Sequence, residues 1–250
     1  ATALLPVAAT PAAAQDLTGR AARDAARAYR EANEAAILRE FTTLLSLPNV
    51  ASDSINIRRN AALLMEMLRK RGASNTQLLE VPGGPPSVYG EIVVPGATRT
   101  VVLYAHYDGQ PVDPRQWTGS GPFTPVLRDK ALFAGGKDIA FPRDGERADG
   151  ESRIYARSAS DDKGSIIAML TALDALKARQ AGASLNVKFF FEGEEEAGSG
   201  HLKAILQKYK TLLKGDAWLF CDGPVHQSGQ QQIVFGLRGV TGLEMTVYGP

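Results

Sequence analysis

The stretch Phe189–Gly200 reads FFFEGEEEAGSG, so three large apolar residues run directly into four carboxylates spread over five positions. Together with the LNVK that precedes it, this apolar run is typical of a buried strand. A run of glutamates is more often a solvated face, but this one follows an apolar strand and precedes a turn of small residues. That position favours a functional role for the acidic groups at the carboxyl end of the strand.

Hydrophobic periodicity in the rest of the chain alternates between the helical and the strand type. Helices are expected within residues 17–47, 58–72, 164–180 and 201–213. Strands are expected at residues 75–81, 87–94, 98–108, 185–193 and 216–222, and residues 109–153 are expected to be mostly loop. Alternating helices and near-continuous apolar strands predict an α/β fold, in which a mostly parallel sheet is flanked by helices on both faces.

Composition excludes several kinds of partner. The 28 basic and 27 acidic residues leave a net charge of +1, so neither nucleic acid nor a membrane surface is expected to bind. No stretch reaches the roughly 18 apolar residues of a membrane span. The single cysteine, Cys221, excludes an internal disulfide, and we expect it to be a buried structural thiol.

Residues 1–15 differ in composition from the rest, because they are apolar, rich in alanine and end in small residues. They resemble the later part of a secretory signal peptide, here a remnant cleaved near Ala14. A disordered Ala/Pro linker is the alternative. We therefore expect an exported protein, periplasmic or secreted, whose folded part begins at residue 16.

Acidic or imidazole groups follow three of the apolar strands. His106 and Asp108 end one strand, the glutamates end a second, Asp222 ends a third, and Asp161 lies just before a helix. In open α/β sheets, ligands bind outside the carboxyl ends of the strands. We therefore expect all these groups to meet at one edge of the sheet.

A divalent cation would explain this collection of side chains. Carboxylates packed together repel one another, and their desolvation is costly unless a cation neutralises them. An imidazole with several carboxylates suits zinc, manganese or cobalt better than calcium or magnesium. An open, carboxylate-rich metal site is of the hydrolytic kind, in which bound water becomes acidic.

Each of these residues also has a purely structural interpretation. His106 could be a hydrogen-bonded core histidine, and Asp222 could be a turn residue before Gly-Pro. Aspartate is a good helix cap, a role that suits Asp162 better than Asp161. The combination of the four groups favours the metal site over these separate explanations.

Four short motifs resemble one enzyme family. HYD at 106–108, SDDKG at 160–164, EGEEEAGS at 192–199 and Asp222 stand in the order found in the co-catalytic zinc peptidases and deacylases. That family includes carboxypeptidase G-type enzymes, carnosine-type dipeptidases, aminoacylases, acetylornithine deacetylase and succinyl-diaminopimelate desuccinylase. The resemblance runs from about residue 30 to the end and is strongest to the dipeptidase branch. It implies a zinc-exopeptidase-like fold.

The resemblance also implies a role for each motif residue. A complete site would hold two zinc (or manganese or cobalt) ions and bind a small peptide or N-acyl amino acid. The implied roles are His106 and Asp222 as ligands of one metal, Asp161 as the carboxylate bridging both, Glu196 as ligand of the other, Glu195 as general base and Asp108 as the carboxylate that orients the imidazole. In that family the peptide bond between the paired aspartates is often cis.

Two stretches of the chain depart from the family pattern. Residues 156–158 read ARS in place of the usual GRG, and the polar loop 134–153 is longer than expected. This loop would either shape the substrate entrance or have no role there.

The C-terminal part of the family's site has no match here. Residues 16–232 match the N-terminal part of the catalytic domain, and 233–250 match the beginning of an inserted α+β lid and dimerisation domain. Neither His201 nor His226 matches the family's further histidines, and we expect both to be structural or exposed. The resemblance thus implies an N-terminal fragment with no or weak activity and at most one competent metal site, taken from a full-length homodimer.

Two classes of function follow. The first is a zinc-dependent hydrolase that cleaves dipeptides or C-terminal residues, with an N-acyl-amino-acid deacylase as the alternative within that class. The second is an inactive, truncated relic that keeps the fold and the motifs without the chemistry.

Overall fold

The computed structural model describes residues 19–179, 183–223 and, nearer the C-terminus, residues 226, 228, 230, 232–237, 239 and 241–249. The expected signal-peptide remnant at residues 1–15 lies outside this set and stays a prediction. Within the part of the chain that is described, none of the helices combines the length and the apolar character that a membrane crossing requires.

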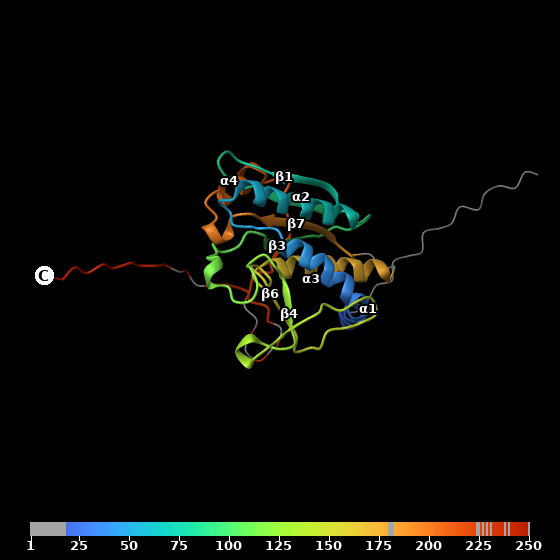
Figure 1. Cartoon of the computed structure of the whole chain (residues 1–250). Coiled ribbons are helices and arrows are strands. Elements are labelled where there is room, and N and C mark those ends of the chain that lie inside the picture. The colour runs from blue at the N-terminus through green and yellow to red at the C-terminus, as the bar shows by residue number, and fades with distance from the viewer. Residues whose placement is uncertain are drawn as a thin grey trace, which may run out of the picture.

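In the described part of the chain two α-helices come first and six strands follow, and helices and strands alternate only after that (Figure 1). The α-helices are α1 (Gly19–Leu45), α2 (Ser54–Lys70), α3 (Lys163–Ala178) and α4 (Leu202–Lys208). The strands are β1 (Ser74–Leu79), β2 (Ser87–Ile92), β3 (Thr100–His106), β4 (Val126–Arg128), β5 (Asp138–Ile139), β6 (Arg153–Tyr155), β7 (Asn186–Glu192) and β8 (Ala217–Phe220). Among the described residues, the short 3₁₀ helices are η1 (Pro114–Gln116), η2 (Leu132–Ala134) and η3 (Glu195–Ala197). The four expected helices and the five expected strands are present, but the helix expected at residues 201–213 is shorter and ends at Lys208.

The main sheet has the strand order β1-β2-β7-β3-β8. Strand β2 pairs antiparallel with both β1 and β7, whereas β3 pairs parallel with both β7 and β8. Four strands therefore run in one direction and β2 runs against them. The carboxyl ends of β3, β7 and β8 consequently meet at one edge, as the sequence predicted.

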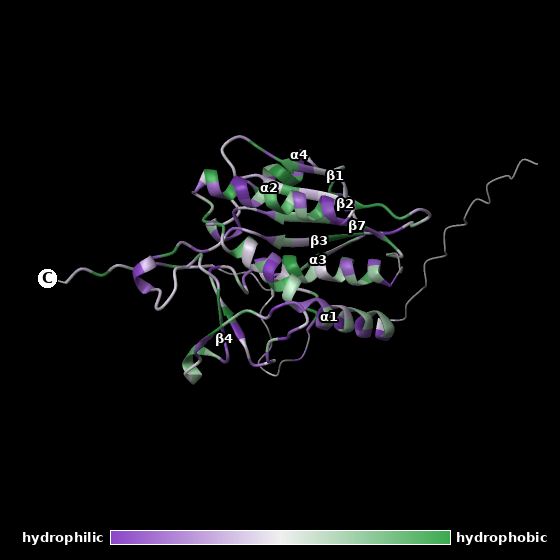
Figure 2. Ribbon diagram, turned by 45° about the vertical axis from the view of Figure 1, so that its right-hand side comes forward, coloured by the Kyte–Doolittle hydropathy of each residue, from purple (hydrophilic) through white to green (hydrophobic). Residues whose placement is uncertain are grey.

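The three phenylalanines of β7 divide between the two faces of this sheet. Phe189 and Phe191 pack with α1, α2 and α3 on one face, while Phe190 packs on the other face with Ile205 of α4. All three side chains are completely buried. Figure 2 shows apolar and polar residues alternating along α1, α2 and α3, as expected for helices that cover a sheet. Helices thus lie on both faces of the sheet, in agreement with the prediction.

A buried arginine joins the three helices of the first face. Arg71, which follows α2, lies 2.6 Å from a carboxylate oxygen of Glu40 on α1 and 2.7 Å from one of Asp174 on α3. Its side chain is only 7% exposed. The guanidinium group of Arg71 therefore links α1 and α3 at the end of α2.

The segment expected to be mostly loop contains a second, small sheet of order β5-β4-β6. These strands are two or three residues long, too short to show periodicity in the sequence. The polar loop 134–153 crosses α1, where Arg39 lies 2.7 Å from Asp144 and Glu34 accepts a hydrogen bond from the Ala148 amide. The described contacts of this loop thus link it to α1.

The C-terminal segment leads away from the body of the molecule (Figure 1). Its described residues form neither helix nor strand, and its apolar side chains are exposed, for example Phe235 at 97% and Leu243 at 95%. The assignment of residues 233–250 to the start of a lid domain stays a prediction.

Candidate metal centre

The predicted residues lie together at the carboxyl edge of the main sheet. His106 ends β3, the residues Glu195 and Glu196 follow β7, Asp222 follows β8, and Asp161 lies just before α3. Strand pairing places His106 opposite the last residue of β7. The sheet therefore collects side chains that the sequence separates by more than one hundred positions.

The imidazole of His106 is the centre of this cluster. It is completely buried, and its Nε2 atom lies 2.8 Å from Asp161 Oδ1, 3.8 Å from Asp222 Oδ2 and 3.9 Å from Glu195 Oε2. Burial alone lowers the pKa of His106, but the contact with Asp108 and the surrounding negative charge outweigh it and raise the pKa to about 10. The surrounding carboxylates therefore favour a positive charge at this point.

Asp108 connects the imidazole to the glutamate turn. Its Oδ1 atom lies 3.4 Å from His106 Nδ1 and accepts a hydrogen bond of 3.0 Å from the Glu195 amide. Its Oδ2 atom accepts a bond of 3.1 Å from the Glu196 amide. The carboxylate is completely buried. The carboxylate of Asp108 thus fixes the backbone of the two glutamates, and the main-chain carbonyl of Asp108, 3.2 Å from His106 Nδ1, holds the ring.

The aspartate pair before α3 divides into an exposed and a buried member. The Asp161 side chain is 65% exposed and faces His106, and the peptide bond that joins it to Asp162 is cis, as the resemblance implied. Asp162 was expected to cap α3, but its side chain makes no capping hydrogen bond. It accepts instead from the His106 amide at 3.1 Å. Burial raises the pKa of Asp162 to about 7.

The adjacent glutamates face different partners. Glu196 accepts a hydrogen bond from the Gln110 side chain. Glu195 faces His106, and burial, together with the charges of Asp222 and Glu196, raises its pKa above the ordinary value for a glutamate. The two neighbouring side chains therefore contact different groups of the site.

The donor set fits a divalent cation. Two groups have donor atoms that all lie within 4.8 Å of one another: His106 with Asp161 and Glu196, and His106 with Asp162 and Asp222. One imidazole nitrogen with several carboxylate oxygens is the ligand chemistry of zinc, manganese and cobalt. Asp162, for which only helix capping was expected, is thus a further candidate for the metal centre.

The remaining histidines and the cysteine lie apart from these groups. His201 pairs with Glu194, Nδ1 to Oε2 at 3.0 Å, and His226 is exposed beside Ser228. The expectation of structural or exposed histidines is therefore confirmed. Cys221 is half-buried rather than fully buried, and this burial raises the pKa of its thiol to about 11.

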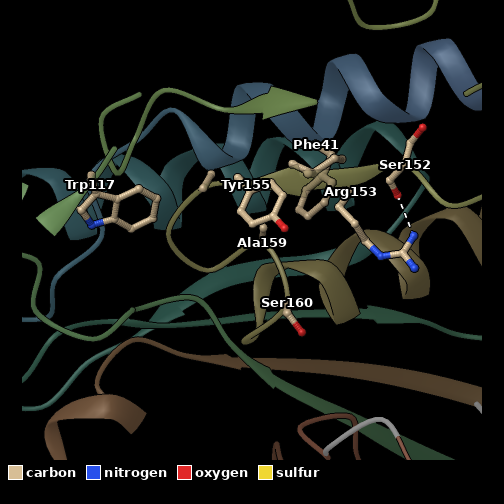
Figure 3. A pocket seen from close by; sticks show the side chains of 9 residues that line it. Phe41, Trp117, Ser152, Arg153, Tyr155, Ala159 and Ser160 are labelled. Carbon is tan, nitrogen blue, oxygen red and sulfur yellow. Dashed lines mark hydrogen bonds between the residues drawn. The ribbon is translucent and has the colours of Figure 1, made fainter. Parts of the chain in front are cut away.

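A cleft of about 440 Å³ lies between α1, β6 and the turn before Asp161 (Figure 3). Phe41, Trp117 and Tyr155 line it together with Ser160. These residues supply neither imidazole nor carboxylate, so the cleft adds no ligand to the candidate metal centre.

Comparison with known proteins gives one family. Residues 102–238, more than half of the chain, match the protein-family model of peptidase family M20/M25/M40. The matched range includes every residue of the candidate metal centre.

The relatives are longer than this chain. The Cys-Gly metallodipeptidase of Schizosaccharomyces pombe is 28% identical over 168 residues, which cover 66% of this chain and 31% of that protein. The Beta-Ala-His dipeptidase of Homo sapiens is 32% identical over 208 residues, covering 80% of this chain and 37% of that protein. The chain thus spans well under half the length of the curated relatives that it matches.

A solved structure of a member of the same family is similar to this chain. An M20 family metallo-carboxypeptidase from Sulfolobus solfataricus superposes with a TM-score of 0.61 at 31% identity, covering 78% of this chain and 39% of that one. Its likeness extends over most of the described fold.

Proposed function

The chain belongs to peptidase family M20/M25/M40, and from this premise we propose that the complete protein is a metal-dependent dipeptidase. The observation that carries the proposal is the meeting of His106 with Asp161, Glu196 and Asp222 at one sheet edge. There His106 shares one close group of donor atoms with Asp161 and Glu196 and another with Asp162 and Asp222. The names of the relatives, a Cys-Gly metallodipeptidase and a Beta-Ala-His dipeptidase, support a dipeptide as the substrate class.

Two zinc, manganese or cobalt ions would be held by His106, Asp161, Asp222 and Glu196. When bound, such ions supply an acidified water molecule and a polarised scissile carbonyl. Glu195 would accept a proton from the attacking water and donate it to the leaving amine. Its raised pKa brings the carboxylate closer to neutral pH, which suits a group that both accepts and donates a proton.

The residues around Glu195 keep it in place for this proton transfer. Asp108 accepts the amide hydrogens of Glu195 and Glu196 and contacts the His106 ring. The backbone of the proposed base and of the neighbouring proposed ligand is therefore positioned by one buried carboxylate.

The test is hydrolysis by the full-length protein. Dipeptides, including Cys-Gly and β-Ala-His, and N-acetyl amino acids would be offered before and after removal of metal with a chelator. We expect the dipeptides to be cleaved, activity to disappear with the chelator, and zinc to restore it. Faster cleavage of N-acetyl amino acids would replace the dipeptidase by a deacylase, and hydrolysis that survives complete metal removal would exclude the mechanism.

The chain of 250 residues offers a second test, because we propose that it binds at most one metal ion and has no or weak activity. Zinc titration of this chain measures the stoichiometry directly. Two tightly bound zinc ions per chain would contradict the proposal and would show that the metal centre needs no further part of the protein.

We also propose export and a homodimer for the full-length protein. The composition of residues 1–15 supports export, and the resemblance of 233–250 to a dimerising lid supports the dimer. Fusion of the N-terminal segment to a periplasmic reporter tests the first, and light scattering of the purified full-length protein tests the second.

A further inference from the structure

A buried asparagine lies between the two loops that carry the metal-centre residues. Asn49, in the connection between α1 and α2, has no exposed surface. Its side-chain Nδ2 donates to the Tyr107 carbonyl at 2.7 Å and to Ser158 Oγ at 2.9 Å. The main-chain carbonyl of Asn49 accepts a hydrogen bond from the Gly109 amide at 3.0 Å. Three hydrogen bonds of one residue thus reach the loop after His106 and the turn before Asp161.

The partner of Asn49 in that turn has an unusual backbone. Ser158 has a φ of 63°, in the left-handed region that favours glycine, and it stands where the family pattern has its second glycine. The side chain is what distinguishes serine from glycine here, and its Oγ accepts the hydrogen bond from Asn49. Because Ser158 is only 5% exposed, little water competes for this bond.

The connection between α1 and α2 is also bound by a residue that follows the aspartate pair. Lys163, the first residue of α3, is completely buried and donates from Nζ to the carbonyls of Leu44 and Leu47 at 2.8 and 3.3 Å. Ser158 and Lys163 therefore both bind residues 44–49, and Asp161 lies between them in the sequence. The end of α1 and the turn after it are the common support of both loops.

We propose that Asn49 is a positioning residue that locks the His106–Asp108 loop and the Ser158–Asp161 turn into one arrangement. The importance of this arrangement for metal binding rests on the function proposed above. The three hydrogen bonds of Asn49, here called the clamp, involve none of the proposed metal ligands. The clamp uses both N–H groups of the amide, while the Asn49 Oδ1 atom is buried without a hydrogen-bond partner. The donors, and not the acceptor, are therefore what the position requires.

A matched control is available in α2. Asn60 is also completely buried, its Nδ2 donates to the carbonyls of Pro48 and Asn56 at 2.8 Å each, and its Oδ1 is likewise without a partner. Its amide joins the turn to α2 and touches neither loop of the metal centre. Asn60→Leu and Asn49→Leu therefore remove the same kind of bonds at the same burial.

The experiment compares full-length wild type, Asn49→Leu, Ser158→Ala and Asn60→Leu. Amide hydrogen exchange of the metal-free protein is followed over residues 107–110 and 156–160, and zinc affinity is measured by competition with a chelator. We expect Asn49→Leu to speed exchange in both loops and to weaken zinc binding by about 10-fold or more, the usual effect of losing a group that orients metal ligands. Ser158→Ala should change both quantities in the same direction but by less.

The control separates the clamp from a general loss of stability. Asn60→Leu, which loses its bond to Pro48 beside Asn49, should lower the melting temperature but change loop exchange and zinc affinity much less than Asn49→Leu does. Equal effects of Asn49→Leu and Asn60→Leu would overturn the proposal, as would wild-type exchange in Asn49→Leu. If Asn49→Leu does not fold, Ser158→Ala decides, and unchanged loop exchange there would overturn it. Failure of the wild-type protein to bind zinc would refute the proposed function. The comparison of amide hydrogen exchange between Asn49→Leu and wild type would still test the proposed role of Asn49.

Discussion

Replacing Asp108 by asparagine should cost more stability than its small change in shape suggests. The two carboxylate oxygens accept one amide hydrogen each, from Glu195 and Glu196, in a completely buried position. Asparagine keeps one acceptor and turns an NH₂ group toward the other amide. One hydrogen bond to a charged group is then lost, about 1.5–3 kcal/mol, and the remaining bond becomes a neutral one of roughly half the strength. We expect a loss of about 3 kcal/mol.

Urea denaturation of the metal-free full-length protein measures this loss. The control is Asp216→Asn, because Asp216 is exposed and accepts a single amide hydrogen, from Thr100 at 2.7 Å, which the asparagine carbonyl can also accept. That substitution should cost less than about 1 kcal/mol. If Asp108→Asn cost no more than Asp216→Asn, the carboxylate would not be the anchor of the glutamate turn.

Three further substitutions test other parts of the account. Glu195→Gln should lower turnover of dipeptides by about 100- to 10,000-fold while zinc affinity stays the same; an equal loss of zinc binding would make Glu195 a ligand. Arg71→Leu should destabilise the protein by about 3–5 kcal/mol in urea denaturation, because it leaves the carboxylates of Glu40 and Asp174 facing each other without a cation. The control Arg58→Leu, which removes the surface pair of Arg58 with Glu80, should cost less than about 1 kcal/mol. Similar losses of stability in the two variants would show that Arg71 is no structural anchor. Gly109→Ala should reduce zinc affinity, because its Cβ would collide with Ser158 Oγ, and unchanged affinity in a zinc titration would mean that the two loops move apart freely.

The sequence predicted the main features of the fold because its apolar runs are long. Phe189–Phe191 identified a buried strand, and the residues after it identified the sheet edge where side chains meet. The direction of β2 was not predictable in this way, since an apolar strand has the same pattern whichever way it runs. The small sheet of β4, β5 and β6 was missed because strands of two or three residues have no measurable period.

The site was predictable only where residue type reveals chemistry. His106 and the acidic groups were found because imidazoles and carboxylates at strand ends are unusual. Asn49 was not found, since an asparagine after a helix usually indicates a turn, and only the folded chain brings it to Ser158. Asp162 was expected to cap a helix, but the approach of β3 gives it the His106 amide as its partner.

The central claim is that His106, Asp161, Glu196 and Asp222 hold the metal ions of this protein. Anomalous diffraction at the zinc edge, from crystals of the full-length protein grown with zinc, locates the ions directly. The account predicts one zinc beside His106 and Asp222, a second beside Glu196, and Asp161 in contact with both. Zinc bound at other residues, with this cluster free of anomalous density, would contradict it.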